Sequence, residues 1–295
     1  MNVLVLTFWT WLATVCMPTY EPVVYVTEED KKLFNEYIEQ IAFQTYNTPE
    51  ELVIATASFF LDRPYVGATL EKEPEGLVVN LRELDCTTFV ETVYALSKTV
   101  LEENKTFDAF CRNLQAFRYR NRKIENYISR LHYTSDWIYE NERKGLMKDL
   151  TRSLGGEPLN MSLSFMSRHP NSYRQLKKNP NWITAIATIE EKINSRFYFF
   201  IPRDRITTCQ AQIRDGDMIC LVTSIEGLDI SHVALAKRVD RELRVIHASS
   251  SRKKVIVEPQ SIQAYTQSIQ KNIGIMVIRP AFYQNNSKAK RIPKR

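Results

Sequence analysis

The chain has 295 residues, of which 44% are hydrophobic and 25% charged, so it is long enough for one large domain or two modest ones with a sizeable core. Its net charge of +6 is mild, and much of the excess lies in the tail 288–295. The sequence has no basic stripe interleaved with stacking aromatic residues, which argues against nucleic acid as a partner. The positive net charge is still compatible with a small anionic substrate.

The first residues have the pattern of an export signal. Residues 3–17 are nearly all apolar, a run that is too short to span a bilayer but fits the apolar part of a secretory signal peptide. No Lys or Arg precedes the run, and a buried N-terminal segment is the alternative. Cys16 could accept a lipid, although Val15 is bulkier than such sites usually tolerate. We predict a signal peptide at 1–19 and export to the periplasm or cell envelope, with no stable membrane insertion after its removal.

Cysteine use gives no sign of a disulfide framework or a metal site. The five cysteines form no CxxC pair and show no zinc spacing, and a chain of this size does not need disulfides for stability. Cys111 falls on an apolar helix face and Cys220 in a predicted strand, so we expect both in the core, while Cys209 is uninformative. We therefore predict neither a metal nor another cofactor.

The first half of the chain has the apolar spacing and the capping residues of helices. Thr27 and Asp30 begin one helix, and Thr48 followed by Pro49 and Glu51 begins another. We predict that these helices run to about residues 43 and 61, that further helices occupy 86–101 and 106–119, and that a short strand occupies 77–79. Residues 25–104 would then hold the N-terminal helices and the helix that begins with Cys86.

The pattern stays helical until about residue 194, but Gly and Pro break it into short pieces after residue 135. We predict an inserted helical subdomain at 105–200, with a loop at 154–167 that borders a cleft.

The last third of the chain changes to strands. Five runs with strand character are separated by turn residues and predict an antiparallel meander, with a short helix at 260–269 in its last connection. A helix group followed by consecutive strands is an α+β pattern, with the sheet at 201–283 and a basic disordered tail at 284–295. The predicted strands are 217–223, 232–239, 243–247, 254–258 and 274–279.

Cys86 stands where a cysteine gains nucleophilic character. Asp85 takes the place of an N-cap, and the apolar residues after Cys86 recur with the spacing of one helix face. The first turn of a helix carries free backbone N–H groups and the positive end of the helix dipole, and both stabilise a thiolate. The alternative is that Cys86 is a small buried hydrophobic residue, as most free cysteines are.

Two histidines are placed to serve such a thiol. His232 begins one predicted strand and His247 ends the next, so a hairpin through residues 240–241 brings both to the same edge of the sheet. If the helix start with Cys86 packs there, a thiolate, a base and an orienting imidazole lie in line, as nucleophilic catalysis requires.

Other interpretations of the histidines remain open at this point. His232 and His247 could be hydrogen-bonded residues at the edge of the core. They could also form an open three-ligand zinc site with Cys86, although the spacing matches no familiar zinc motif. His132 and His169 lie in the helical region with nothing nearby that completes a site, so we expect surface or structural roles for them.

Five segments together resemble the NlpC/P60 cysteine peptidase superfamily, and within it the bacterial N-acetylmuramoyl-L-alanine amidase-like group. The resemblance covers about residues 50–100 and 205–280 and implies a papain-like core, in which the Cys-bearing helix start packs on an antiparallel sheet or partial barrel. The helical stretch between departs from the compact pattern, which leaves the substrate specificity open. The segments, in the expected order, are RPYVG (63–67), LDCTTFV (84–90), DGDMI (215–219), SHVAL (231–235) and VIHASS (245–250).

The resemblance implies a role for each residue of the candidate triad. Cys86 would attack an amide carbonyl, His232 would take its proton and pass it to the leaving amine, and His247 would hold the His232 ring. Tyr65 would orient the substrate or stabilise the oxyanion, together with the backbone N–H of Cys86.

Three neighbours of the triad complete the candidate site. Asp85, Thr87 and Ser231 flank the cysteine and the first histidine in the matching segments, so we count them with Tyr65 as substrate or oxyanion candidates.

The implied activity is hydrolysis of the amide between N-acetylmuramic acid, including its 1,6-anhydro form, and L-alanine in peptidoglycan fragments, through a thioester. One alternative is an endopeptidase that cuts L-Ala–D-Glu or γ-D-Glu–diamino acid bonds. Another is a non-catalytic cell-wall-binding module that has kept the fold. The expected partners are muropeptides, and we expect a monomer.

Overall fold

The computed structural model describes residues 22–102 and 104–283, which form a mixed α+β fold. The predicted signal peptide at 1–19, with Cys16, and the predicted tail at 284–295 lie outside the described residues. No helix within the described ranges has both the length and the apolar character needed to cross a membrane.

An open sheet of eight strands forms the centre of the fold. Its strands lie in the order β4-β5-β10-β6-β7-β8-β9, and β3 pairs with the end of β10. Every pair is antiparallel, and β4 and β9 form two separate edges, so the described sheet is not a closed barrel. The strands are β3 Met147–Asp149, β4 Glu157–Leu159, β5 Tyr198–Pro202, β6 Met218–Thr223, β7 Ile230–Val239, β8 Glu242–Ser249, β9 Lys254–Val257 and β10 Asn272–Pro280.

Helices supply the other layers, and a small parallel pair of strands, β1 and β2, lies apart from the main sheet. β1 is Val24–Tyr25 and β2 is Leu77–Val78. The α-helices are α1 Glu28–Tyr37, α2 Pro49–Phe59, α3 Cys86–Leu101, α4 Phe107–Arg118, α5 Thr134–Arg143, α6 Phe165–Arg168, α7 Arg174–Lys178, α8 Pro180–Asn194, α9 Ile206–Cys209 and α10 Ile262–Ser268. The short π and 3-10 turns are η1 Ile38–Ala42, η2 Arg120–Arg122, η3 Tyr127–Ser129, η4 Pro170–Ser172 and η5 Ala281–Tyr283.

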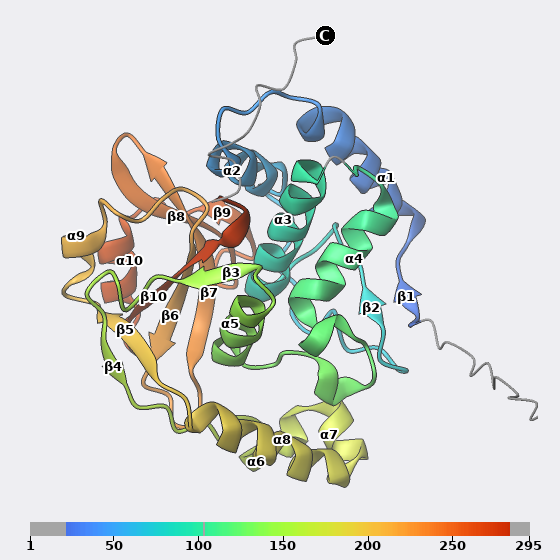
Figure 1. Cartoon of the computed structure of the whole chain (residues 1–295), viewed down its shortest axis with the longest axis vertical. Helices are drawn as coiled ribbons and strands as arrows, with labels where there is room; N and C mark the ends of the chain where they lie inside the picture. Colours follow the sequence, from blue (N-terminus) through green and yellow to red (C-terminus); the bar gives the residue numbers. More distant parts are fainter. Residues whose placement is uncertain (1–21, 103, 284–295) are drawn as a thin grey trace, which may run out of the picture.

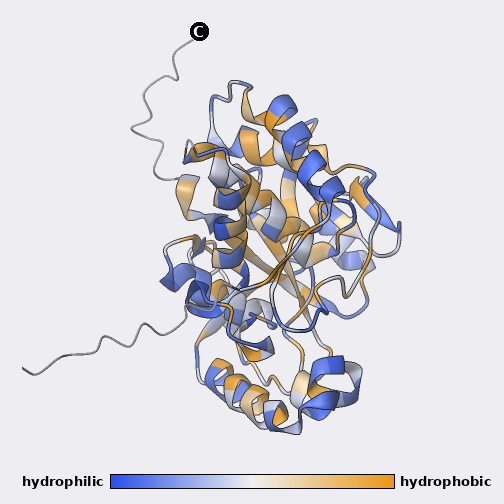
Figure 2. Cartoon of the chain, turned by 90° about the vertical axis from the view of Figure 1, so that its right-hand side faces the viewer, coloured by the Kyte–Doolittle hydropathy of each residue, from blue (hydrophilic) through white to orange (hydrophobic). Residues whose placement is uncertain are grey.

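The sheet is covered on both faces (Figure 1). Along β6, Met218 and Cys220 belong to the apolar cluster that includes α3, whereas Ile219 and Leu221 belong to the cluster that includes Ile262 of α10. This alternation follows from the two-residue period of a strand. In the turned view of Figure 2, the hydrophobic segments gather between the helices and the sheet, so the main core lies where α3 packs on the strands.

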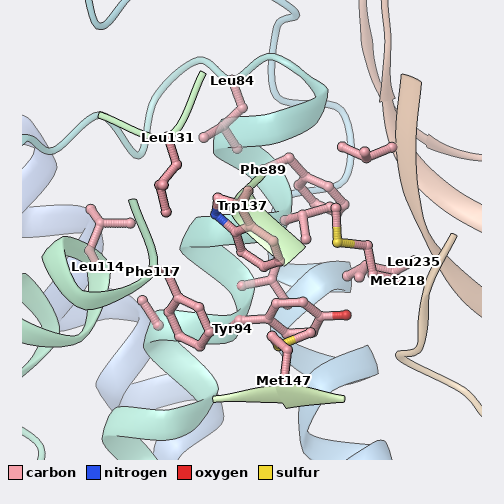
Figure 3. Packing of buried hydrophobic residues seen from close by; sticks show 14 of the residues in the cluster. Leu84, Phe89, Tyr94, Leu114, Phe117, Leu131, Trp137, Met147, Met218 and Leu235 are labelled. Carbon is pink, nitrogen blue, oxygen red and sulfur yellow. The ribbon is translucent and has the colours of Figure 1, made fainter. Parts of the chain in front are cut away.

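Helices α3, α4 and α5 are joined by a buried polar network inside an aromatic core. Trp137 of α5 stacks on Phe117 of α4 with ring centroids 6.0 Å apart, and Figure 3 shows both rings within the core. The indole N–H of Trp137 donates to the Glu91 carboxylate of α3 at 3.0 Å. The same carboxylate accepts Nε of Arg118 at 2.7 Å, and Arg118 also donates to the Val78 carbonyl at 2.7 Å. The α3 helix is therefore anchored from two sides.

The predicted helices of the first half are confirmed, including their caps. Thr27 Oγ1 accepts the Asp30 N–H, and Thr48 Oγ1 accepts the Glu51 N–H, each at 3.2 Å. The Glu51 carboxylate accepts the N–H of Asn47 at 2.8 Å, one residue earlier than a standard capping box predicts.

The predicted meander is correct for β6 to β9 and wrong for β10. β10 does not follow β9 in the sheet but lies beside β6. The predicted short helix, α10, stands in the connection that carries the chain back. The apolar run of β10 is continuous, which is typical of a strand buried on both faces. Such a strand belongs in the middle of a sheet rather than at its edge.

The stretch 105–200 contributes strands as well as helices. β3, β4 and most of β5 fall within it, and β3 and β5 both pair with β10. Strands of three residues are too short to show a period, so the sequence pattern did not reveal β3 or β4. The separation of this stretch as an inserted subdomain stays a prediction.

Candidate active site

Cys86 is the first residue of α3 and lies within a complete capping box formed by Asp85 and Thr88. Asp85 is the N-cap: its Oδ1 accepts the Thr88 N–H at 2.8 Å, and Thr88 Oγ1 accepts the Asp85 N–H at 2.9 Å. The Asp85 carboxylate is thus engaged in holding the helix start. The thiol consequently stands at the end of the helix where backbone N–H groups lack intrahelical acceptors.

The Cys86 thiol is neutral in the free protein. Burial, followed by the negative charge of Asp85, raises the pKa of Cys86 to about 11, and the N–H of Val233 and the Thr87 side chain lower it by less. Thr87 Oγ1 lies 4.0 Å from Sγ and its side chain is exposed. The helix-start argument alone predicts the opposite direction for this pKa. A thiolate must therefore be generated by a base.

The β7–β8 hairpin brings the two predicted histidines together. Asp240–Arg241 form its two-residue turn with positive φ angles, as a type I′ turn requires. Leu235 pairs with Ile246, and His232 and His247 lie an odd number of residues from that pair, so both project from the same face of the hairpin.

The two imidazoles form a direct hydrogen bond. His232 Nε2 lies 2.6 Å from His247 Nδ1, and the rings are nearly perpendicular, with centroids 4.9 Å apart. Burial, with a contribution from His247, lowers the pKa of His232 to about 3. Burial lowers the pKa of His247 to about 4. Both rings are neutral at neutral pH, so each ring carries one N–H and one nitrogen lone pair.

A β-bulge stands beside His232. Leu221 of β6 pairs with His232, but the next residue, Val222, pairs with Ile230, which leaves Ser231 as an extra residue in β7. Such bulges re-aim neighbouring side chains and are frequent next to active sites. Ser231 itself is exposed and donates weakly to the Leu221 carbonyl at 3.4 Å.

Tyr65 lies beside the thiol. The chain at Tyr65 is fixed between two segments: its N–H donates to the Lys253 carbonyl at 2.9 Å, and Leu84 donates to the Pro64 carbonyl at 3.0 Å. Burial, followed by the charges of Cys86 and Asp85, raises the pKa of Tyr65 to about 12. Its hydroxyl therefore stays protonated and is available as a donor.

Two residues of the site have no counterpart in the sequence prediction. The ring of Tyr265, on α10, lies 5.4 Å from that of His247, and its pKa is raised by burial and then by Glu258 and Cys86. Glu258, directly after β9, has Oε2 at 3.6 Å from His247 Nε2. Both come from separate elements far along the chain, and no local pattern distinguishes them from ordinary residues.

The remaining histidines lie outside this group. His132 Nε2 bonds the Tyr127 carbonyl at 2.8 Å, and burial, followed by Arg130, lowers the pKa of His132 to about 3. His169 is exposed, with Nδ1 at 2.9 Å from the Phe165 carbonyl. Structural roles fit both.

The other cysteines of the described residues are free thiols, and they take part in no group of side chains that could bind a metal ion. Cys209 and Cys220 are buried and Cys111 is partly exposed. Within residues 22–102 and 104–283, no three His, Cys, Asp or Glu side chains are grouped so as to hold a metal ion.

The solved structures that are 36% identical to this chain carry two different names. An N-acetylmuramoyl-L-alanine amidase from Bacteroides uniformis is 36% identical, with a TM-score of 0.76 over 79% of this chain and 98% of that one. A Bacteroides fragilis protein named as a candidate xylanase is also 36% identical, with a TM-score of 0.72 over 76% of this chain and 99% of that one. A Legionella pneumophila protein with 22% identity and a TM-score of 0.62 over 85% of this chain and 93% of that one shares the fold.

No curated protein matches the chain. The model of the AmiA-like family, described as N-acetylmuramoyl-L-alanine amidase-like, matches residues 55–275, which include α3, the hairpin and Glu258. The chain therefore belongs to the AmiA-like family of N-acetylmuramoyl-L-alanine amidase-like proteins.

Proposed function

We propose that this protein is a cysteine amidase with an NlpC/P60-type papain-like core, and that it hydrolyses the amide between N-acetylmuramic acid and L-alanine in peptidoglycan fragments. The observation that carries the proposal is the neutral His232–His247 pair, joined at 2.6 Å, next to a helix-start cysteine. The N–H of Val233, the residue after His232, is among the groups that lower the pKa of Cys86, so the thiol lies close to this part of β7. Nucleophile, base and orienting group are the three parts of covalent acyl transfer.

The reaction begins with proton transfer from Cys86 to His232. Nε2 of His232 is occupied by His247, so Nδ1 is the nitrogen left to accept the proton. The sulfur attacks the lactyl carbonyl carbon of the muramic acid, and the carbonyl oxygen becomes an oxyanion. The Cys86 backbone N–H and the Tyr65 hydroxyl are the proposed donors to it.

The intermediate collapses when the C–N bond breaks. His232 returns its proton to the departing nitrogen, so that the L-alanine peptide leaves as an amine and a thioester remains on Cys86. Water then attacks the thioester with His232 as base, which releases the muramic acid carboxylate and restores the thiol.

Three other functions remain to be separated by experiment. An endopeptidase with the same residues would cut L-Ala–D-Glu or γ-D-Glu–diamino acid bonds, and a binding module would leave substrate intact. A xylanase is suggested by the name of one 36%-identical neighbour, but glycoside hydrolysis generally needs an acid and a carboxylate flanking the bond. The thiol and paired imidazoles of this site favour acyl transfer instead.

The proposed substrate, a peptidoglycan fragment, fits a location in the cell envelope. We infer that residues 1–19 act as a signal peptide, that the mature protein works as a monomer in the periplasm or cell envelope, and that muropeptides, including 1,6-anhydro forms, reach it there. Thr87 and Ser231, both exposed beside the thiol and the base, are the proposed substrate contacts, while Asp85 acts through the helix cap.

The test is digestion of defined muropeptides, with N-acetylmuramic acid in the ordinary or the 1,6-anhydro form, followed by mass spectrometry. We expect wild type to release a peptide that begins with L-alanine, and Cys86→Ala to release none. Cys111→Ala, which removes the other partly exposed thiol, should keep full activity. Fragments cut after L-alanine or after D-glutamate would establish the endopeptidase, and reducing sugar from xylan would establish the glycosidase.

A further inference from the structure

Glu258 faces the nitrogen of His247 that does not contact His232. Its Oε2 lies 3.6 Å from His247 Nε2, and only 7% of the residue is exposed. The N–H of Glu258 donates to the Val245 carbonyl at 2.8 Å. Glu258 therefore lies beside Val245 of β8, which is two residues before His247. Nε2 of His247 is buried without a hydrogen-bond partner among the described residues.

The His232–His247 hydrogen bond allows two arrangements of its protons, and only one gives a base. If His232 Nε2 carries the hydrogen and donates to His247 Nδ1, then His232 Nδ1 has a free lone pair and His247 carries its hydrogen on Nε2. If His247 Nδ1 donates instead, His232 carries its hydrogen on Nδ1 and cannot deprotonate a thiol there. In that second arrangement the His247 Nε2 lone pair would face the carboxylate.

We propose that Glu258 is a positioning residue that selects the active arrangement, because its carboxylate accepts the Nε2–H of His247 and repels a lone pair in that place. The proposal rests on the proposed cysteine amidase function for its consequence, but not for its geometry. A charge-assisted N–H···O bond has a length of about 2.7–2.9 Å, so the carboxylate moves roughly an ångström closer in the working site. Such tightening on substrate binding is common for catalytic hydrogen bonds.

Of the groups described around His247, Glu258 is the one placed to accept its Nε2–H. The His247 ring contacts His232 from β7 and Tyr265 from α10, and the Tyr265 ring lies at 65° to it, so Tyr265 contributes a packing surface. Glu258 is the anion that faces its free nitrogen. When His232 takes the thiol proton, the carboxylate also stabilises the resulting imidazolium through His247 and does not itself need to take a proton.

The experiment combines tautomer measurement with kinetics on the whole protein. Nitrogen NMR of ¹⁵N-histidine-labelled wild type at pH 7.5 should show His232 with its hydrogen on Nε2 and a bare Nδ1. His132→Gln and His169→Gln identify the signals of those two histidines. The two that remain, His232 and His247, share one tautomer, because the hydrogen bond between the neutral rings places both hydrogens on Nε2 or both on Nδ1. A hydrogen on Nδ1 of His232 in wild type would overturn the proposal, whatever the Glu258 variants show.

Glu258→Gln and Glu258→Ala then measure the effect of the carboxylate. We expect the His232 signals to indicate a mixture of tautomers and kcat on muropeptides to fall about 10- to 100-fold with little change in KM. Glu226→Gln, which removes an exposed carboxylate, is the control. Unchanged tautomer signals in folded Glu258→Ala, which has no side-chain acceptor, would contradict the proposal. If wild type cleaves no muropeptide, the proposed function fails, whereas the NMR result still decides the role of Glu258.

Discussion

Asp85 and Thr88 exchange two hydrogen bonds across the first turn of α3, at 2.8 and 2.9 Å, and Cys86 lies between them as the first residue of the helix. The carboxylate that holds the helix start is also a negative charge beside the sulfur, where it adds to burial in raising the pKa of Cys86. One residue therefore has two opposing effects: it orders the nucleophile and disfavours its thiolate form.

Asparagine at this position should separate these two effects. Asn is as good an N-cap as Asp, so Asp85→Asn keeps the helix start but removes the charge, and the pKa of Cys86 should fall. We expect the rate of Cys86 alkylation by iodoacetamide to rise at a lower pH than in wild type, as followed by peptide mass spectrometry. Asp85→Ala should show the same shift but lose about 1 kcal/mol of unfolding free energy with the cap. Glu28→Gln, at the exposed start of α1, is the control. An alkylation profile that does not move in Asp85→Asn would refute the charge effect.

The histidines with lowered pKa predict how stability depends on pH. His132, His232 and His247 stay neutral in the folded protein down to pKa values of about 3, 3 and 4, whereas an unfolded chain protonates histidine near pH 6.5. Between pH 6.5 and about 4 the unfolded state binds more protons, so the unfolding free energy falls as pH falls. Above pH 6.5 these groups add no pH dependence.

His132→Gln tests this effect outside the proposed catalytic group. The variant should lose about 2 kcal/mol less unfolding free energy than wild type between pH 6.5 and 4.5, because one neutral imidazole is absent. Urea unfolding at several pH values measures the difference, and the exposed His169→Gln is the matched control. Equal pH dependence in wild type and His132→Gln would show that His132 is protonated in the folded state.

The sequence predicted the structure best where the structure depends on residues close together in the chain. The cap at Asp85 depends on residues three apart, and the hairpin through Asp240–Arg241 needs only two residues with positive φ. For that reason the juxtaposition of His232 and His247 followed from their places at a strand start and a strand end. The position of β10 depends on a long connection, and no short-range pattern specifies which strand it joins.

The pKa of Cys86 and the charged groups around His247 could not be predicted from local sequence patterns. The helix dipole at Cys86 is implied by the sequence, but the burial of the thiol in the tertiary fold is not, and burial is the largest influence on its pKa. Tyr265 and Glu258 approach His247 from different elements, so their proximity is a product of the tertiary fold.

The last prediction concerns the buried ion pair that holds α3 in place. Glu91 and Arg118 are each 3% exposed, with Nε and Oε2 2.7 Å apart, and Glu91 also accepts the Trp137 indole N–H at 3.0 Å. Removing one partner leaves the other charge buried without compensation, which typically costs about 3 to 5 kcal/mol. We expect Glu91→Ala and Arg118→Ala to lower the unfolding free energy by amounts in that range, measured by urea denaturation.

The exposed pair Arg168 and Glu226 provides the contrast, because it lies 3.2 Å apart but at 66% and 89% exposure. An exposed pair contributes about 0 to 1 kcal/mol, so Glu226→Ala should be nearly neutral. Because Glu91 lies five residues after Cys86 on the same helix, a loosened α3 should also reduce muropeptide cleavage by Glu91→Ala even at temperatures where the variant is folded. A Glu91→Ala variant as stable as Glu226→Ala would mean that the carboxylate does not hold α3 against α4 and α5.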